Sequence, residues 1–154
     1  MERKWSAMDP AVAFFPVELR PVFIEASAQG NDLFAGGGYQ ALPRHQAVVD
    51  VGANHAFAVV TEDYRLVTNR QAFDLAADAL KQVFDFTSME DMACLNVTMP
   101  KSRSFCHIDL IHNGSDFEPW QNDRWVPFVR ITNSYNRTRR FLPLDLSERA
   151  NLWR

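Results

Sequence analysis

The chain has 154 residues, of which 47% are apolar and 23% are charged, and its formal net charge is −3. This length fits a single domain over residues 1–154, and the apolar fraction supports a buried core and excludes a disordered chain. No apolar run reaches the roughly 18 residues of a membrane span, and the first ten residues lack the apolar centre of a signal peptide. The composition therefore predicts a cytoplasmic protein.

The charge is distributed unevenly along the chain. Residues 1–123 hold 9 basic and 17 acidic residues, whereas residues 124–154 hold 7 basic and 2 acidic residues. A general DNA binder usually has a strongly basic face, so an acidic body with a basic tail argues against that class. The acidic body could instead present its surface to a basic partner protein.

The first third of the chain reads as extended structure and loop. Each of the three prolines in this part restricts the residue before it to extended conformations. They are Pro10, Pro16 and Pro21, and they predict an extended arm or short edge strands over 1–22. Residues 27–46 are rich in Gly, Ala and Gln and predict a loop. An α+β core is expected over 47–146, and it begins with strands that form a hairpin. These strands cover 45–51, 55–60 and, after a polar turn, 64–68.

A helix is expected over about 68–85. Thr68 and Gln71 have the spacing of a capping box, in which each side chain bonds the backbone of the other residue. Apolar residues then recur at helical spacing, which predicts one buried face. They are Phe73, Ala76, Ala77, Leu80, Val83 and Phe84. Asp74, Asp78, Lys81 and Gln82 are expected on the outer side.

The second half predicts further strands over 93–99, 104–111 and 125–132. Residues 141–146 predict an edge strand, because Pro143 cannot donate to a central ladder. Strands that precede and follow one helix in the sequence predict the fold class: α+β, with a mainly antiparallel sheet and one principal amphipathic helix at about 68–85.

Two segments carry a resemblance to a known family. They are Asp63-Tyr-Arg-Leu-Val-Thr-Asn-Arg-Gln-Ala-Phe73 and Phe128-Val-Arg-Ile-Thr-Asn-Ser-Tyr135. In order and spacing they resemble an uncharacterised family encoded by phages, plasmids and integrated mobile elements, over about residues 55–140. Members of that family continue into further strands, so the chain is expected to be a shortened relative. The resemblance implies a bacterial host cell and supplies no catalytic residues.

No complete catalytic or metal motif is present. His107, Asp109, His112 and Asp116 could supply metal ligands, but no HExxH-type spacing occurs, so a hydrogen-bonded strand face is favoured. Ser134 lacks a nucleophile elbow and is expected to close a polar turn by bonding backbone amides. The chain is therefore expected to be no enzyme and to need no metal or cofactor.

The two cysteines, Cys94 and Cys106, lack zinc-ligand spacing. They are expected to stay reduced and to act as small buried apolar residues.

Two clusters are candidates for contact with a partner. Arginine forks beside an aromatic ring suit phosphate contact and base stacking, but a solvated turn that pairs with the acidic body is favoured over this interpretation. This basic cluster consists of Arg130, Tyr135, Arg137, Arg139 and Arg140. Trp120 and Trp125 flank an acidic loop, and a tryptophan there can be an interface anchor or core packing. The acidic residues of that loop are Asp116, Glu118 and Asp123.

Three functions compete. The favoured hypothesis is a non-enzymatic accessory protein of a mobile element that binds and inhibits a host nucleoprotein defence complex, as anti-CRISPR proteins do. The alternative is a single-stranded nucleic-acid-binding or recombination accessory protein acting through the Arg-rich segment 130–140. A small enzyme using the His107 and Asp109 face is the third. An edge strand near either terminus could also support a homodimer.

Overall fold

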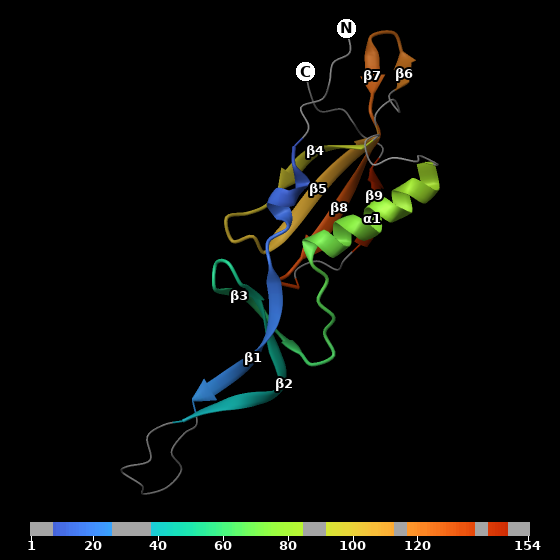
Figure 1. Ribbon diagram of the computed structural model, residues 1–154. Helices are drawn as coiled ribbons and strands as arrows, with labels where there is room; N and C mark the ends of the chain where they lie inside the picture. Colours follow the sequence, from blue (N-terminus) through green and yellow to red (C-terminus); the bar gives the residue numbers. More distant parts are fainter. Residues whose placement is uncertain (1–7, 26–37, 85–91, 113–116, 138–141, 148–154) are drawn as a thin grey trace, which may run out of the picture. The chain divides into compact units, whose positions relative to one another are not determined.

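The computed structural model describes residues 8–25, 38–84, 92–112, 117–137 and 142–147 (Figure 1). The protein is α+β: every strand pair is antiparallel, and the described residues contain one α-helix. The elements in chain order are η1 (Pro10–Ala13), β1 (Val17–Glu25), β2 (Tyr39–Asp50), β3 (His55–Thr61), α1 (Asn69–Phe84), β4 (Met92–Thr98), β5 (Phe105–His112), β6 (Phe117–Trp120), β7 (Asp123–Trp125), β8 (Phe128–Ser134) and β9 (Leu142–Ser147). This confirms the predicted fold class.

The chain divides into two compact units, which are described separately below. One unit contains residues 16–66, and the other contains residues 1–15 together with 67–154. The single domain over 1–154 stays a prediction, because units of this kind can fold together or separately.

The unit of residues 16–66 is a three-stranded sheet with the order β1-β2-β3. β1 is an edge strand, as the proline-rich start of the chain predicts. Val17, Val48 and Val60 are buried in this unit. The predicted loop over 27–46 is wrong for residues 39–46, because β2 begins at Tyr39 and pairs with β1 over 39–41 and again from Gln46. The rest of that loop, up to residue 37, lies outside the described residues.

The third strand of the predicted hairpin does not form. The backbone N–H of Tyr64 donates to the Thr61 carbonyl at 3.0 Å, so the chain turns directly after β3. Residues 64–68 then run as irregular structure to the start of α1. The apolar alternation of this segment predicted a strand, but the turn and the helix cap redirect its backbone away from the ladder.

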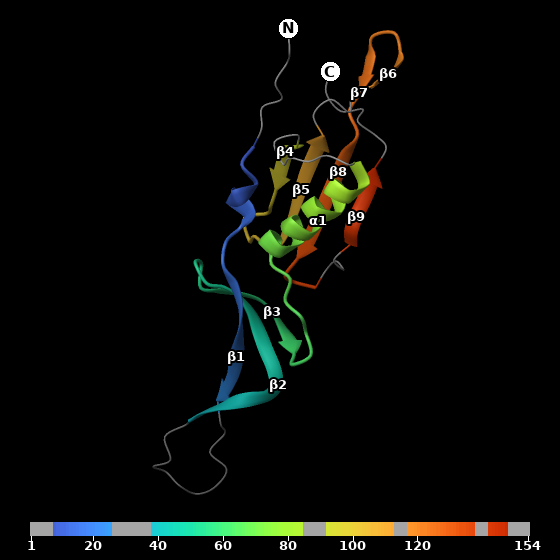
Figure 2. The same cartoon turned by 45° about the vertical axis from the view of Figure 1, so that its right-hand side comes forward.

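The larger unit is a four-stranded antiparallel sheet with the order β4-β5-β8-β9, and α1 covers one face of it (Figure 2). Alternate strand residues point to this face, as the two-residue period of a strand requires. The buried cluster between helix and sheet also takes in η1. Its members are Ala13, Ala72, Ala76, Leu80, Cys94, Cys106, Ile108, Leu110, Val129 and Ile131.

The capping box at the start of α1 is confirmed. The backbone N–H of Thr68 donates to Gln71 Oε1 at 2.9 Å, and the backbone N–H of Gln71 donates to Thr68 Oγ1 at 3.2 Å. Ala76, Ala77 and Leu80 are buried as the helical period predicts. The reciprocal bonds satisfy two backbone donors at this end, which fixes where the helix begins.

Two strand boundaries differ from the sequence prediction. β8 begins at Phe128 rather than Trp125, and it continues through Asn133 and Ser134, which were expected in a turn. These two polar residues keep strand geometry because both pair with β5, Asn133 opposite Cys106 and Ser134 opposite Phe105.

The edge strand predicted near the end of the chain is confirmed as β9, which pairs with β8. The hairpin β6–β7 forms a two-stranded sheet of its own that the sequence did not predict. Within the described ranges, no helix is long and apolar enough to cross a membrane.

Candidate functional site

The two segments that carry the family resemblance meet in the structure. The Nδ2 amide of Asn133, in β8, donates to Asn69 Oδ1 at 2.9 Å and to the Val67 carbonyl at 3.0 Å. Asn69 in turn donates from its own Nδ2 to the Ala13 carbonyl at 2.9 Å. Bonds between residues more than 60 positions apart therefore join the start of α1 to β8, and a bond across 56 positions joins it to η1.

Tyr135 completes this network, and its predicted role needs correction. The side chain is 0% exposed, and its hydroxyl accepts the backbone N–H of Asn69 at 2.7 Å. Its ring meets Phe15 edge-on, with 5.9 Å between the ring centres. A base cannot stack on a ring enclosed in this way, so Tyr135 belongs to the interior rather than to a contact surface.

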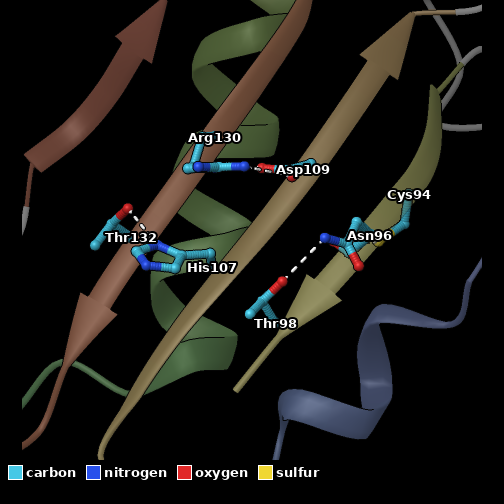
Figure 3. A network of polar contacts seen from close by, with 7 residues as sticks. All are labelled: Cys94, Asn96, Thr98, His107, Asp109, Arg130 and Thr132. Carbon is cyan, nitrogen blue, oxygen red and sulfur yellow. Dashed lines mark hydrogen bonds and ion pairs between the residues drawn. The ribbon is translucent and has the colours of Figure 1, made fainter. Parts of the chain in front are cut away.

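Arg130 lies on the sheet face opposite α1 and is held by an acidic residue. Its Nε and Nη2 donate to the two carboxylate oxygens of Asp109, at 2.7 and 2.9 Å (Figure 3). The Asp109 side chain is only 7% exposed, so the bidentate bonds satisfy a nearly buried carboxylate. The guanidinium also lies 5.7 Å from the centre of the Phe128 ring. This geometry favours the pairing role over phosphate contact for Arg130.

Arg137 is the other described arginine of the basic cluster. Arg137 is exposed, and its φ of 61° places it in the left-handed region. Arg139 and Arg140 lie outside the described residues, as does Asp116 of the acidic loop. Of the five residues proposed for nucleic-acid contact, the structure therefore buries one and pairs another with a carboxylate.

The same sheet face carries His107, which the sequence placed beside Asp109. Its Nδ1 lies 2.9 Å from Thr132 Oγ1, and Asn96 donates to Thr98 on the neighbouring strand β4 at 2.9 Å (Figure 3). Among the described residues, no three His, Cys, Asp or Glu side chains gather in a way that could hold a metal ion. The hydrogen-bonded strand face favoured by the sequence is what these contacts form.

Ser134 is buried at the end of β8, and its hydroxyl donates to Asn136 Oδ1 at 2.8 Å. Its side chain therefore bonds a polar side chain two residues ahead, where the chain bends after β8. The predicted bonds from Ser134 to backbone amides stay a prediction.

Both cysteines are buried and unoxidised. Burial raises the pKa of the Cys94 thiol, and it raises the pKa of Cys106 to about 12. These are the properties of structural thiols, since a reactive cysteine needs an accessible thiolate.

The hairpin β6–β7 presents the aromatic residues of the acidic loop. Trp120 is 66% exposed and Phe117 is 53% exposed. Both rings lie 6.4 Å from the half-buried ring of Trp125, which joins them into one aromatic cluster. Core packing is therefore wrong for Trp120, and the alternative of a surface anchor fits its exposure.

The two described acidic residues of this hairpin have different positions. Glu118 is exposed, and its Oε1 accepts the backbone N–H of Asn122 at 2.9 Å. Asn122 has a φ of 65°, a conformation that asparagine adopts more readily than most residues. Asp123 is half-buried opposite Trp120. Glu118 thus shapes the turn while keeping a negative charge beside the exposed rings.

Comparison with protein-family models, with curated proteins and with solved structures gives no match to this chain. The relation to a family of mobile-element proteins therefore stays a prediction that rests on the two motifs.

Sequence reasoning missed a second group of exposed apolar side chains, on β1 and β2. Phe23 is 57%, Ile24 46% and Tyr39 79% exposed. Assigning 27–46 to a loop concealed the strand that carries Tyr39. Pro43, beside a run of polar residues in an otherwise strand-like segment, was the available signal of an interrupted strand.

Proposed function

We propose that this protein is a non-enzymatic binding protein that docks onto a basic surface of a protein or nucleoprotein partner through the hairpin β6–β7. The observation that carries the proposal is the exposed pair Phe117 and Trp120, with Trp125 behind them. Large aromatic side chains of this kind are enriched among residues that dominate binding energy. A monomer seldom presents such a group without a use for it.

The charge around the rings indicates the chemistry of the partner. Glu118 and Asp123 lie on the same hairpin, and residues 1–123 carry 17 acidic against 9 basic residues. Negative charge around an aromatic anchor fits a positively charged groove and would speed association with it. A groove that normally holds nucleic acid has this character.

The class of partner comes from the resemblance to mobile-element proteins. We propose a host nucleoprotein defence complex, with a CRISPR effector as the first candidate, in the bacterial cytoplasm. Occupying its nucleic-acid channel would inhibit it, as anti-CRISPR proteins do. Binding of single-stranded nucleic acid through 130–140 is less well supported, because Tyr135 is enclosed and Arg130 pairs with Asp109.

A pull-down tests the proposal. The tagged full chain is incubated with lysate from a CRISPR-bearing host, and the retained proteins are identified by mass spectrometry. We expect a CRISPR effector to be retained by the wild type and lost with Trp120→Ala. Binding should also weaken as salt rises, because exposed charges are screened.

Leu75→Ala is the matched control, because Leu75 is also a large exposed apolar residue, at 55%, but lies on α1. It should retain the effector as the wild type does. Retention of no effector, or equal retention by Trp120→Ala, would reject the proposal.

A further inference from the structure

The strand β2 is interrupted by a wide bulge. Pro21 pairs with Gln46 and Phe23 pairs with Ala41, so residues 42–45 of β2 stand opposite Val22 alone. Arg44, within the bulge, has a φ of 61°. This left-handed conformation costs an ordinary residue about 1–2 kcal/mol. Bulges change the direction of side chains and are frequent beside binding sites, so the side chains of this bulge are candidates for a binding site.

Glu62, just after β3, holds the bulge at two points. Its backbone N–H donates to the Arg44 carbonyl at 3.0 Å, and its Oε1 accepts from Arg44 Nε at 2.9 Å. The Arg44 side chain is nevertheless 81% exposed. Since Glu62 takes the Nε side of the guanidinium, the Nη side is oriented toward solvent. A guanidinium fixed in this way is suited to bidentate contact with a carboxylate.

A hollow of about 450 Å³ lies at this point. Its lining consists of Arg44, His45, Thr61, Glu62 and Asp63. All five lining residues are exposed, so the hollow is a shallow depression of the surface. His45 Nδ1 lies 2.9 Å from the Pro43 carbonyl, so in the neutral ring Nδ1 carries the proton and Nε2 is an acceptor. The lining thus offers one cation, two carboxylates, a hydroxyl and an imidazole acceptor.

The hollow lies where β3 ends beside β2. Thr61 pairs with His45, and among the described strands only β1 pairs with the rest of β2, from Tyr39 to Ala41. Within the described residues, no strand therefore pairs with the edge of β2 over residues 39–42, which β3 would occupy if it were longer. Pro43 has no N–H and limits the pairing to this stretch. The exposed ring of Tyr39 stands at its far end.

We infer that this edge and hollow bind an extended peptide segment of a partner protein, which adds to β2 in line with β3. A carboxylate of the segment pairs with the Nη side of Arg44, and a neighbouring basic side chain lies against Glu62 and Asp63. Backbone bonds to residues 39–42 supply affinity without regard to sequence, and the charges at the hollow select a mixed-charge segment. This site is separate from the hairpin β6–β7.

A random-peptide display library selected on the immobilised full chain tests the inference. Enriched peptides are synthesised with a fluorophore, and their affinities are measured by anisotropy. We expect sequences that carry an acidic residue next to a basic one, and binding at least about tenfold weaker to Arg44→Gln. Arg44→Lys should weaken binding similarly, because it keeps the charge and loses the fork. The bound peptide should slow amide hydrogen exchange in residues 39–42.

Arg65→Gln is the matched control, since Arg65 is an exposed arginine of the same unit outside the hollow. It should bind the peptides like the wild type, and so should Trp120→Ala, which separates this site from the proposed function. The inference is wrong if no peptide is enriched, if Arg44→Gln binds as tightly as the wild type, or if exchange in residues 39–42 is unchanged. Circular dichroism of each variant excludes unfolding as the cause of lost binding.

Discussion

Tyr135 and Trp120 are large aromatic residues within one short stretch of sequence, and the structure gives them opposite surroundings. Tyr135 is 0% exposed and bonds the first residue of α1, whereas Trp120 is 66% exposed on a two-stranded hairpin. The segment around Tyr135 is one of the two on which the predicted family relation rests, yet its described side chains lie mainly in the interior. The segment around Trp120 carries no such motif, yet it presents a contact surface. In this chain, a recognisable motif marks how the protein folds, and exposure marks where it could bind.

The largest effect expected from this contrast is on stability. Tyr135→Ala removes an enclosed ring and leaves the Asn69 backbone N–H without its 2.7 Å acceptor. We expect the free energy of unfolding to fall by about 3–5 kcal/mol, as for other large aromatic residues truncated in a core. Urea unfolding followed by circular dichroism measures the change.

Tyr39→Ala is the control for that variant, because Tyr39 is 79% exposed. It should change the free energy of unfolding by no more than about 0.5 kcal/mol. A loss below about 1 kcal/mol for Tyr135→Ala would show that the motif network contributes little to the fold.

The next largest effect is on binding. Trp120→Ala should weaken binding of the captured partner by at least about 2 kcal/mol, or roughly thirtyfold in Kd, as truncation of a hot-spot tryptophan does. The same variant should leave the free energy of unfolding within about 0.5 kcal/mol of the wild type, because the ring is largely exposed. Isothermal titration and urea unfolding measure the two quantities. If Trp120→Ala loses stability but keeps its affinity for the partner, Trp120 serves the fold rather than a contact surface.

A smaller effect is expected at the capping box. Thr68→Ala removes the acceptor of the Gln71 backbone N–H and should lower the free energy of unfolding by about 1 kcal/mol. Combining it with Gln71→Ala should give less than the sum of the two changes, since each residue bonds the other. Gln82→Ala, on the exposed side of the same helix, is the control. Strict additivity of the two changes would mean that the box does not act as a unit.

A further effect is a dependence on pH. Burial raises the pKa of Cys106 from 9.0 to about 12, so the unfolded chain loses this proton first as pH rises. Stability from this thiol is fully present below pH 9.0 and is lost as pH climbs toward 12. Urea unfolding at pH 8 and pH 10, with Cys106→Ala as the reference, measures the difference. A wild type that falls no more than the variant would contradict the assignment.

Local patterns predicted much of this fold. The capping box and the helical period placed α1 within a residue or two, and strict alternation placed β5. Long-range pairing explains the errors. The strand β2 begins at Tyr39 because residues 39–41 and 46 pair with β1 on either side of a bulge. Residues 64–68 leave the sheet because the turn after β3 redirects them. Neither cause is visible in the composition of a short window.

Only part of the candidate sites could be predicted from the sequence. The position of Trp120 in a polar loop indicated a possible interface residue, but its exposure depends on the hairpin β6–β7, which the sequence did not predict. Tyr135 and Arg130 suggested a basic-aromatic patch, and only the tertiary structure shows that one is enclosed and the other meets Asp109 on the next strand. The hollow beside Arg44 depends on a bulge, for which Pro43 was the one signal in the sequence, and the register that creates it depends on pairing with β1.

A phage-plaquing assay tests the central claim most directly. The wild type, Trp120→Ala and the Leu75→Ala control are expressed in a bacterial host whose CRISPR system targets the infecting phage. The proposed function predicts that the wild type and Leu75→Ala restore plaques, while Trp120→Ala leaves the host immune. Equal plaque numbers with the wild type and Trp120→Ala, or no plaques with any of them, would contradict it.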